Sequence, residues 1–265
     1  MIRGWYIGAS GMNAQQARLD AISNNLANVD TTAYKKDVAV NKSFPELLLR
    51  RLNDDGVYKT YFGSADAAPI IGKIGLGVET NELYTILEQG SFKETGSFTD
   101  FALQEEGFFV VETPQGERYT RNGNFMVGKE GYLQTKEGYP VLGDKGRIYV
   151  EDIKFVAKED GVLYSEEDME EIDRLKLVRF DNERYLKKIG SNLYQDTNIS
   201  GEAYSAEGFE RPIVLQSYTE TSNVNVVNEM VQMIDVNRAY EANQKTIQAG
   251  DSMMSTLWTK VASIR

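Results

Sequence analysis

The sequence predicts an α+β protein, in which long N- and C-terminal helices form a coiled-coil layer and a mainly antiparallel β domain is inserted between them. The last 40 or so residues follow a seven-residue apolar repeat, with no proline after Pro212. The middle of the chain instead alternates short β-rich runs with turn residues. The predicted segments are a terminal helix in 1–35, an extended linker in 36–80, a β-rich domain in 81–214 and a terminal helix in 215–265.

The C-terminal helix, predicted over Val224–Val261, has a seam of two columns. The first column is apolar and contains Met233, Tyr240, Ile247, Met254 and Val261. The companion column is apolar at its ends and polar in its middle: Met230, Asn237, Gln244, Asp251 and Trp258. Burying each large apolar side chain is worth about 1.5–3 kcal/mol, so we expect this chain or other copies to cover the seam.

A second amphipathic helix is predicted from about Ile7 to Leu26, although Gly8 and Gly11 weaken its first turns. Its apolar positions follow helical spacing: Trp5, Ala9, Met12, Leu19, Ile22, Leu26 and Val29. Turn residues from Asn28 to Thr32 end it. Pairing the two terminal helices is the simplest way to cover both apolar stripes.

The chain between the helices has weaker signals. Phe44–Leu52 suggests a short helix with Pro45 at its first position, and Gly63–Gly77 is loop-like. From Val78 to about Tyr218, regularly spaced turns favour a β sandwich or barrel. Its predicted strands include Leu83–Leu87, Phe108–Val111, Tyr119–Thr120, Phe125–Val127, Ile148–Val150, Leu175–Phe180 and Leu193–Tyr194. The acidic run Glu166–Glu171 lacks the spacing of a calcium loop, which favours a solvated loop or helix start over a cation site.

Composition excludes several functions. The chain has no Cys and no His, which removes thiol nucleophiles, histidine triads and nearly all zinc sites. Its net charge of −11 makes nucleic acid an improbable partner, and the excess lies in residues 36–214 because both ends are near neutral. No apolar run is long enough for stable membrane insertion, and the polar residues after Arg3 do not form a secretory signal. Export, if it occurs, requires another route.

Three motifs stand out in the chain. The N-terminal motif is Ser23–Lys35, and the C-terminal motif comprises Glu220–Val226, Glu229–Val231 and Asn237–Lys245. The third motif, in the middle, comprises Gly107–Val111 and Tyr119–Phe125. The two terminal motifs resemble those of the bacterial flagellar axial proteins of the rod and hook, and the third resembles the β-domain pattern of the rod members. The family usually has glycine where this chain has Ala33, and we expect either ordinary dihedral angles there or a left-handed strain that the fold tolerates.

Within that family, Gly138–Gly143 followed by Gly146–Ile148 is most similar to the rod protein between the proximal and distal rod. Ser222–Asn228 and Ile189–Tyr194 are equally similar to the distal rod protein. The resemblance implies a structural subunit of the periplasmic rod, exported without a cleaved signal peptide and not an enzyme. It implies as partners self copies, neighbouring rod proteins, hook-side and motor-side axial proteins and the flagellar export apparatus, with no cofactor, metal or catalytic residue.

The predicted site is an assembly interface on the terminal helices, whose ends we expect to order on incorporation. The interface residues are Met12, Leu19, Ile22, Asn24, Asn25, Leu26, Asn28, Met230, Met233, Asn237, Ala239, Tyr240, Ala242, Gln244, Ile247, Met254 and Trp258. Three alternatives remain open: a distal rod or hook subunit, a secreted coiled-coil interaction module, and a hydrolase with paired carboxylates, for which no residue pair stands out.

Overall fold

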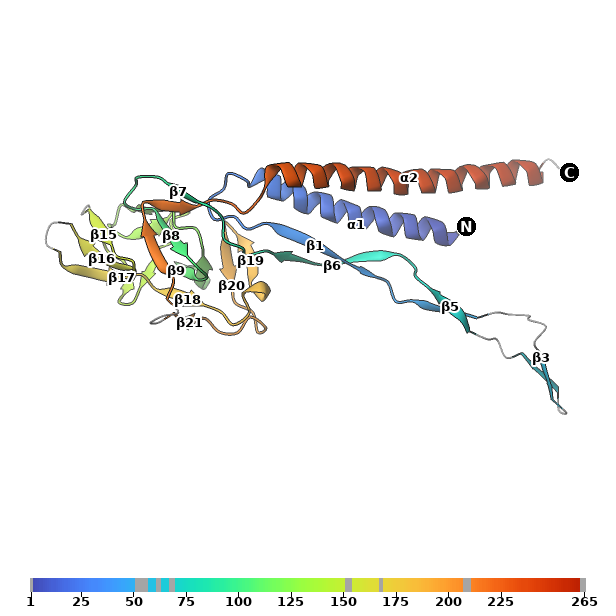
Figure 1. Cartoon of the computed structure of the whole chain (residues 1–265), viewed down its shortest axis with the longest axis horizontal. Helices are drawn as coiled ribbons and strands as arrows, with labels where there is room; N and C mark the ends of the chain where they lie inside the picture. Colours follow the sequence, from blue (N-terminus) through green and yellow to red (C-terminus); the bar gives the residue numbers. More distant parts are fainter. Residues whose placement is uncertain are drawn as a thin grey trace. The chain divides into compact units, whose positions relative to one another are not determined.

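Two long helices and many antiparallel strands make the protein α+β, as predicted (Figure 1). The computed structural model describes residues 2–50, 57–60, 63–66, 70–150, 154–166, 169–206 and 211–262. The chain divides into two compact units, each built from segments that are distant in the sequence. Unit 1 contains Met1–Ser23, Ala39–Leu83 and Met230–Arg265, and unit 2 contains Asn24–Val38 and Tyr84–Glu229. The unit boundaries therefore fall inside the terminal helices, inside the predicted linker between Val38 and Ala39, and just beyond that linker between Leu83 and Tyr84.

Both predicted terminal helices are present. Helix α1 covers Ile2–Ala27 and α2 covers Val226–Ala262. The side chain of Asn225 accepts a hydrogen bond from the Asn228 amide at 3.1 Å, which caps the start of α2. The Asn28 side chain bonds to the Asn24 carbonyl at 2.8 Å where α1 ends. Neither helix, over the part that the structure describes, carries an apolar stretch long enough to cross a membrane.

The segment between α1 and the β domain is a series of paired strands. These are β1 (Asp37–Ser43), β2 (Leu47–Arg50), β3 (Val57–Thr60), β4 (Gly63–Asp66), β5 (Ile70–Ile74) and β6 (Val78–Thr85). They pair as β1 with β6, β2 with β5, and β3 with β4.

The prediction of a helix over Phe44–Leu52 is therefore wrong for its described part, and Arg51 and Leu52 lie outside the described residues. The prediction of a loop over Gly63–Gly77 is also wrong, because it contains β4 and β5. Leu47 lies opposite Ile74 in an antiparallel register, in which the facing edges of the two strands exchange backbone hydrogen bonds. Such long-range pairing leaves no periodic signal in either segment alone.

Unit 2 contains short strands joined by tight turns. They are β7 (Phe92–Glu94), β8 (Phe101–Gln104), β9 (Phe108–Thr113), β10 (Gly116–Thr120), β11 (Phe125–Val127), β12 (Leu133–Thr135), β13 (Leu142–Gly143), β14 (Gly146–Arg147), β15 (Phe155–Ala157), β16 (Val162–Ser165), β17 (Glu171–Arg174), β18 (Leu177–Arg179), β19 (Lys187–Gly190), β20 (Leu193–Gln195), β21 (Tyr204–Ser205), β22 (Ile213–Gln216) and β23 (Tyr218–Glu220). A single 3-10 turn, η1, covers Glu183–Tyr185.

Six of these strands form the main sheet, in the order β19-β20-β10-β9-β18-β21. The other strands of unit 2 form two- and three-stranded sheets, where a sandwich or barrel was predicted. The predicted strand Ile148–Val150 makes only an isolated bridge between Tyr149 and Tyr132. Of the acidic run, Glu167 and Asp168 lie outside the described residues, and Glu171 begins β17. Among the residues that the structure describes, no cluster of acidic side chains could hold a metal ion.

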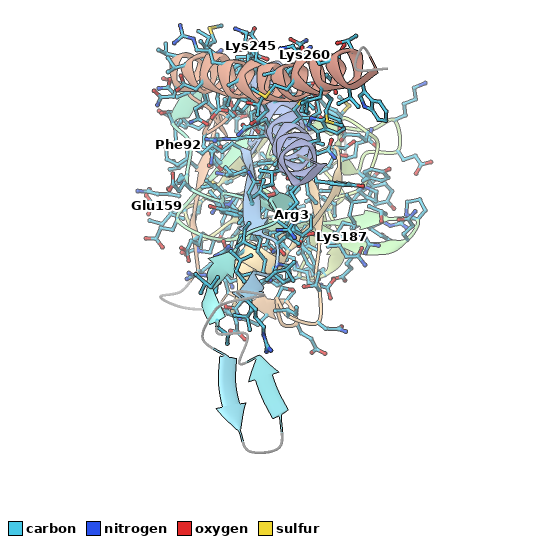
Figure 2. The ribbon with its side chains drawn as sticks, turned by 90° about the vertical axis from the view of Figure 1, so that its right-hand side faces the viewer. Arg3, Phe92, Glu159, Lys187, Lys245 and Lys260 are labelled. Carbon is cyan, nitrogen blue, oxygen red and sulfur yellow. The ribbon has the colours of Figure 1, made fainter. Side chains whose placement is uncertain are left out.

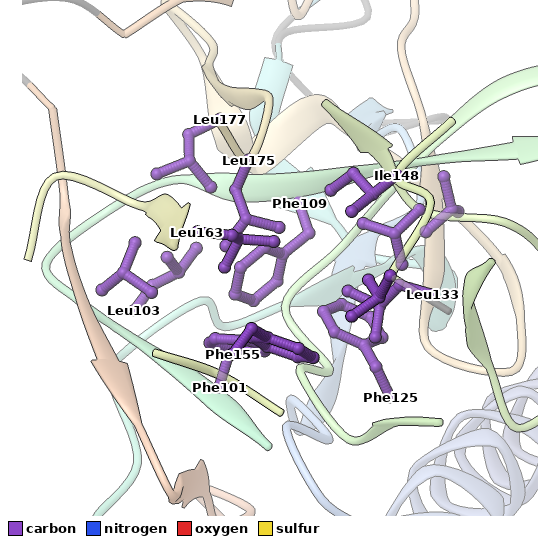
Figure 3. Close-up of a cluster of buried hydrophobic side chains, with 14 of the residues drawn as sticks. Phe101, Leu103, Phe109, Phe125, Leu133, Ile148, Phe155, Leu163, Leu175 and Leu177 are labelled. Atoms are coloured by element: carbon purple, nitrogen blue, oxygen red, sulfur yellow. The ribbon is translucent and has the colours of Figure 1, made fainter. Parts of the chain in front are cut away.

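Strand β9 organises the core because successive side chains point to opposite faces of the sheet. Phe109 and Val111 lie in one buried cluster, and Phe108 and Val110 lie in the other. Figure 3 shows Phe109 above the stacked rings of Phe101 and Phe155, whose centroids are 6.1 Å apart. Both faces of the strand are buried away from solvent, which explains its continuous run of apolar residues in the sequence.

Ala33 adopts a left-handed conformation, with φ of 55°. Of the two expectations for this position, ordinary dihedral angles are wrong, and the fold tolerates the left-handed strain. Ala33 is only 1% exposed, and its amide donates to the Glu220 carbonyl at 2.8 Å. That backbone bond holds the turn in place although a Cβ makes the conformation unfavourable by about 1–2 kcal/mol.

We expect Ala33→Gly to raise the free energy of unfolding by up to about 1 kcal/mol, because glycine relieves the left-handed strain but loses more chain entropy on folding. Ala102→Gly is the control, since Ala102 is fully buried inside β8 and gains no such relief. Chemical denaturation of both variants measures the difference. Equal destabilisation by the two substitutions would contradict a strained Ala33.

Candidate assembly interface

Within unit 1, α1 and α2 pack closely in antiparallel directions through small residues. A Cβ at Gly8 would lie 3.0 Å from Ile247, and one at Gly11 would lie 2.8 Å from the Asn243 side chain. A Cβ at Gly250 would collide with the indole of Trp5. The glycines that weaken the helix in isolation therefore accept the side chains of the opposite helix.

The buried side of α2 differs by one residue from the predicted seam. Met233, Ile247 and Met254 of the first predicted column are partly buried. The companion column consists of Val236, Asn243 and Gly250, and Val236 is only 2% exposed. Met230, Asn237, Gln244, Asp251 and Trp258 of the predicted companion column are exposed, so α1 of the same chain does not cover them. Their place in a contact between copies stays a prediction. The column of Val236, Asn243 and Gly250 faces α1 because glycine lets the two helices approach closely, and a pattern of hydrophobic residues does not show this.

The interface residues predicted on α1 are divided between its two sides. Ile22 is buried, Asn24 is exposed, and Met12, Leu19, Leu26 and Asn28 are partly buried. The residues that the prediction missed are small: Gly8, Gly11, Ala14 and Ala21. The spacing of Gly8, Gly11 and Ala14 at every third residue is the sequence signal that would have identified them.

Two groups of apolar side chains on α2 are exposed, among the described residues of the chain. The first group contains Val227, Met230, Val231 and Ile234, which are 49–69% exposed. The second group contains Met253, Leu257, Trp258 and Val261, which are 46–68% exposed. Of the other predicted interface residues on α2, Ala242 is exposed, Tyr240 is 36% exposed and Ala239 is partly buried. Exposed groups of several large apolar side chains on one helix are typical of surfaces that another polypeptide covers.

In unit 2, Asn25 fastens the end of α1 to the segment that follows it. Its side-chain amide donates to the Asp37 carbonyl at 2.9 Å, and its side-chain oxygen accepts from the Asp37 amide at 2.9 Å. The same oxygen accepts from the Tyr34 hydroxyl at 3.2 Å. Asn25 is 1% exposed, so its hydrogen bonds are used inside the chain and not on its surface.

Lys35 and Glu220 form a buried ion pair that links the two ends of unit 2. Lys35 Nζ lies 2.5 Å from Glu220 Oε1, and both side chains are at most 1% exposed. Lys35 also donates to the Glu88 carbonyl at 2.7 Å, and Glu220 Oε1 accepts from the Gly90 amide at 2.8 Å. Arg121 Nη1 lies 3.8 Å from Glu220 Oε2. We call the contacts of Lys35 and Arg121 with Glu220, together with the hydrogen bonds of Asn25 to Tyr34 and Asp37 on the same segment, the clasp.

Burial at the clasp shifts the pKa of Lys35 and of two neighbouring groups, Tyr34 and Glu183. Burial lowers the pKa of Lys35, against the opposing effect of Glu220. Burial also raises the pKa of Tyr34, with a further contribution from the charge of Asp37. The pKa of nearby Glu183 is raised by burial although Arg121 favours its charged form. Lys35 and Glu220 are buried and held by hydrogen bonds to backbone groups, which is the arrangement of a structural network.

Side chains from the rest of unit 2 hold the segment after α1. Lys188 Nζ donates to the Lys35 carbonyl at 3.0 Å and lies 3.9 Å from the centre of the Tyr34 ring. Asn192 donates to the Thr32 carbonyl at 2.9 Å. Asn223 accepts from the Lys36 amide at 2.8 Å and donates to the Ile86 carbonyl at 2.8 Å. The motif residues at both ends of the chain therefore have well-defined roles inside unit 2.

These features define a class of protein. The buried polar groups are used to fix the chain, and the large apolar surface without cover lies along a terminal helix. This combination is typical of a structural subunit that assembles with other polypeptides.

Comparison with known proteins identifies the family. The family described as "Flagella basal body rod protein" matches residues 6–35, and "Flagellar basal body rod FlgEFG protein C-terminal" matches 215–258. "Flagellar hook protein FlgE/F/G D1 domain" matches 102–166. The matches cover both terminal helices and part of the β domain.

Curated relatives match nearly the whole chain. The flagellar basal-body rod protein FlgG of Buchnera aphidicola subsp. Schizaphis graminum is 36% identical, over 97% of this chain and 99% of that protein. FlgG of Borreliella burgdorferi is 34% identical, over 96% and 97%. The flagellar hook-basal body complex protein FlhO of Bacillus subtilis is 31% identical over the full length of both. The chain belongs to the flagellar basal-body rod protein family, as the resemblance predicted.

The contact between α1 and α2 gives a prediction for two Gly→Ala variants. We expect Gly250→Ala to lower the thermal stability of unit 1, because its Cβ collides with Trp5. A Cβ at Gly4 in α1 would have no atom within 4 Å. Gly4→Ala should therefore stabilise the helix by about 1 kcal/mol, which is the gain in helix propensity. Thermal unfolding followed by circular dichroism measures both. Stabilisation by Gly250→Ala as well would show that the helices do not approach at that residue.

The clasp gives a second prediction. Lys35→Met should destabilise the protein by about 3–5 kcal/mol, because it leaves the Glu220 carboxylate buried without its nearest cation. Adding Glu220→Gln should recover part of the loss, and Lys73→Met, in an exposed ion pair with Glu46, is the control that should change little. Urea denaturation compares the three variants. If the double variant is less stable than Lys35→Met alone, the buried charge is not the cause of the loss.

Proposed function

We propose that this chain polymerises in many copies through the outward face of its terminal helices and so forms the shaft of the flagellar rod, which transmits torque from motor to hook. Membership of the family makes the chain a structural component of the flagellar basal body. The two exposed apolar groups on α2 are the observation that carries the proposed contact. Leaving their large side chains in water is unfavourable, and a second copy removes them from water at no cost to the fold.

The proposed contact is head-to-tail. A heterologous contact leaves an unfilled surface on each new copy, so it builds a helical assembly and not a closed dimer. In this assembly the paired helices form a coiled-coil inner layer, with the acidic β domains outside it. The helical ends are near neutral, so many copies can approach without like-charge repulsion.

The clasp suits a shaft that transmits torque. Torque applied to the terminal helices passes into unit 2 through the last turn of α1 and the first turn of α2, whose residues Asn25 and Glu229 are buried there. Each ion pair and hydrogen bond of the clasp resists rotation of these turns within unit 2. Rigidity at this point is what a drive shaft requires of its subunits.

The location and the remaining partners belong to the same proposal. The chain passes through the flagellar export apparatus without a cleaved signal peptide and acts in the periplasm, between motor-side and hook-side axial proteins. The free helical ends gain protection when copies assemble. Its position along the rod, between the proximal and distal rod or within the distal rod, stays a prediction.

Ala242→Asp tests the proposed contact. Ala242 is exposed on α2, so a carboxylate there should leave the fold intact while it prevents apolar contact with the next copy. In cells that depend on this chain, we expect loss of swimming and loss of the chain from isolated basal bodies. Ile199→Asp is the matched control, since Ile199 is 65% exposed in unit 2. Normal swimming with Ala242→Asp would place the contact between copies elsewhere.

A further inference from the structure

The seam of α2 continues beyond the point where α1 ends. Trp5 lies opposite Gly250 and α1 begins at Ile2, so the last turns of α2 have no helix opposite them. Leu257 and Val261 continue the two seam columns, and both are exposed, at 46% and 66%. Trp258 adjoins them and is 68% exposed. We call Leu257, Trp258 and Val261 the overhang, which occupies about 8 Å of helix.

Unit 1 also contains an apolar groove on the opposite side of α1 from α2. Its lining residues are Arg3, Tyr6, Ala9, Ser10, Asn13, Phe44 and Leu76, and its volume is about 450 Å³. On α1, each of Tyr6, Ser10 and Asn13 lies two positions from Gly8 or Gly11. Two positions of helix correspond to a rotation that leaves these three side chains about 160° away from the contact with α2. Figure 2 shows Arg3 on the side of α1 that faces away from α2. The groove is therefore separate from the seam.

We propose that the overhang of one copy fills the α1 groove of the next copy, with the indole of Trp258 as its anchor. This proposal deepens the proposed function and rests on it, since it names the contact through which copies join. The overhang of a chain cannot fill its own groove, because α2 is a continuous helix that packs on the other side of α1. The occupant must come from another molecule.

Three observations favour a second copy of this chain as that molecule. The overhang extends an existing helix–helix interface, so its side chains already have the spacing that packs against a helix. The groove and the overhang are both apolar, and neither has an acidic side chain. A knob and a groove at different places on one chain form a heterologous contact, which is the kind that propagates.

Mixed single-cysteine variants test the contact, because the natural chain contains no cysteine. Asn13→Cys introduces a thiol into the groove, and Ser255→Cys introduces one beside Trp258 on a second, size-tagged copy. Any disulfide that joins the two variants is intermolecular by construction. After co-expression in cells that depend on this chain, we expect basal bodies to contain the mixed disulfide dimer. Lys245→Cys, which replaces Ser255→Cys in the control, should give at least about tenfold less, since Lys245 faces away from α1 (Figure 2).

A second variant tests the anchor. Adding Trp258→Ser to the tagged copy should reduce the mixed dimer by at least about tenfold, as loss of a buried anchor residue does. Basal bodies that contain both variants without the mixed dimer would overturn this inference while the proposed function stands. A disulfide from the tagged copy to a different rod component alone would also overturn it. Absence of the unmodified chain from basal bodies would contradict the proposed function itself.

Discussion

The buried charge of Glu220 is the constraint on which unit 2 depends. This carboxylate faces two cations, Lys35 from the segment after α1 and Arg121, which follows β10. It also accepts a hydrogen bond from the backbone amide of Gly90. A buried charge is tolerated only when its partners hold fixed positions. Glu220, at the end of β23, also supplies the backbone carbonyl that accepts a hydrogen bond from the Ala33 amide. The two ends of the chain are thus fixed to each other through the β domain.

The terminal motifs contain residues with two different roles, which the structure places apart: some hold the subunit together, and others are exposed to other polypeptides. Asn25, Lys35 and Glu220 are buried and act within the subunit. Met230, Trp258 and their neighbours along α2 are exposed and remain available to other polypeptides. Apolar surface provides contact between copies without a demanding geometry, whereas the buried polar groups fix one conformation. A subunit of a rigid shaft requires both properties.

Much of the fold could be predicted from the sequence. Uninterrupted apolar periodicity without proline determined both helices, since helical hydrogen bonds are local. Turn residues at regular spacing indicated the β domain, and the terminal motifs indicated the family. The β1–β6 region could not be predicted, because strands such as β2 and β5 are stabilised by partners distant in the sequence. The run of leucines at Leu47 has no period that distinguishes strand from helix.

The sequence by itself therefore determined that two helices flank a β-rich middle and that they carry apolar stripes in need of cover. Only the tertiary structure decided which side of α2 faces α1. Contact at Gly8, Gly11 and Gly250 depends on how closely two backbones approach, and hydrophobicity does not encode that distance. The left-handed Ala33 and the pairing of Lys35 with Glu220, 185 residues apart, were likewise decided by the folded chain. Both need a geometry that exists only after the distant segments have met.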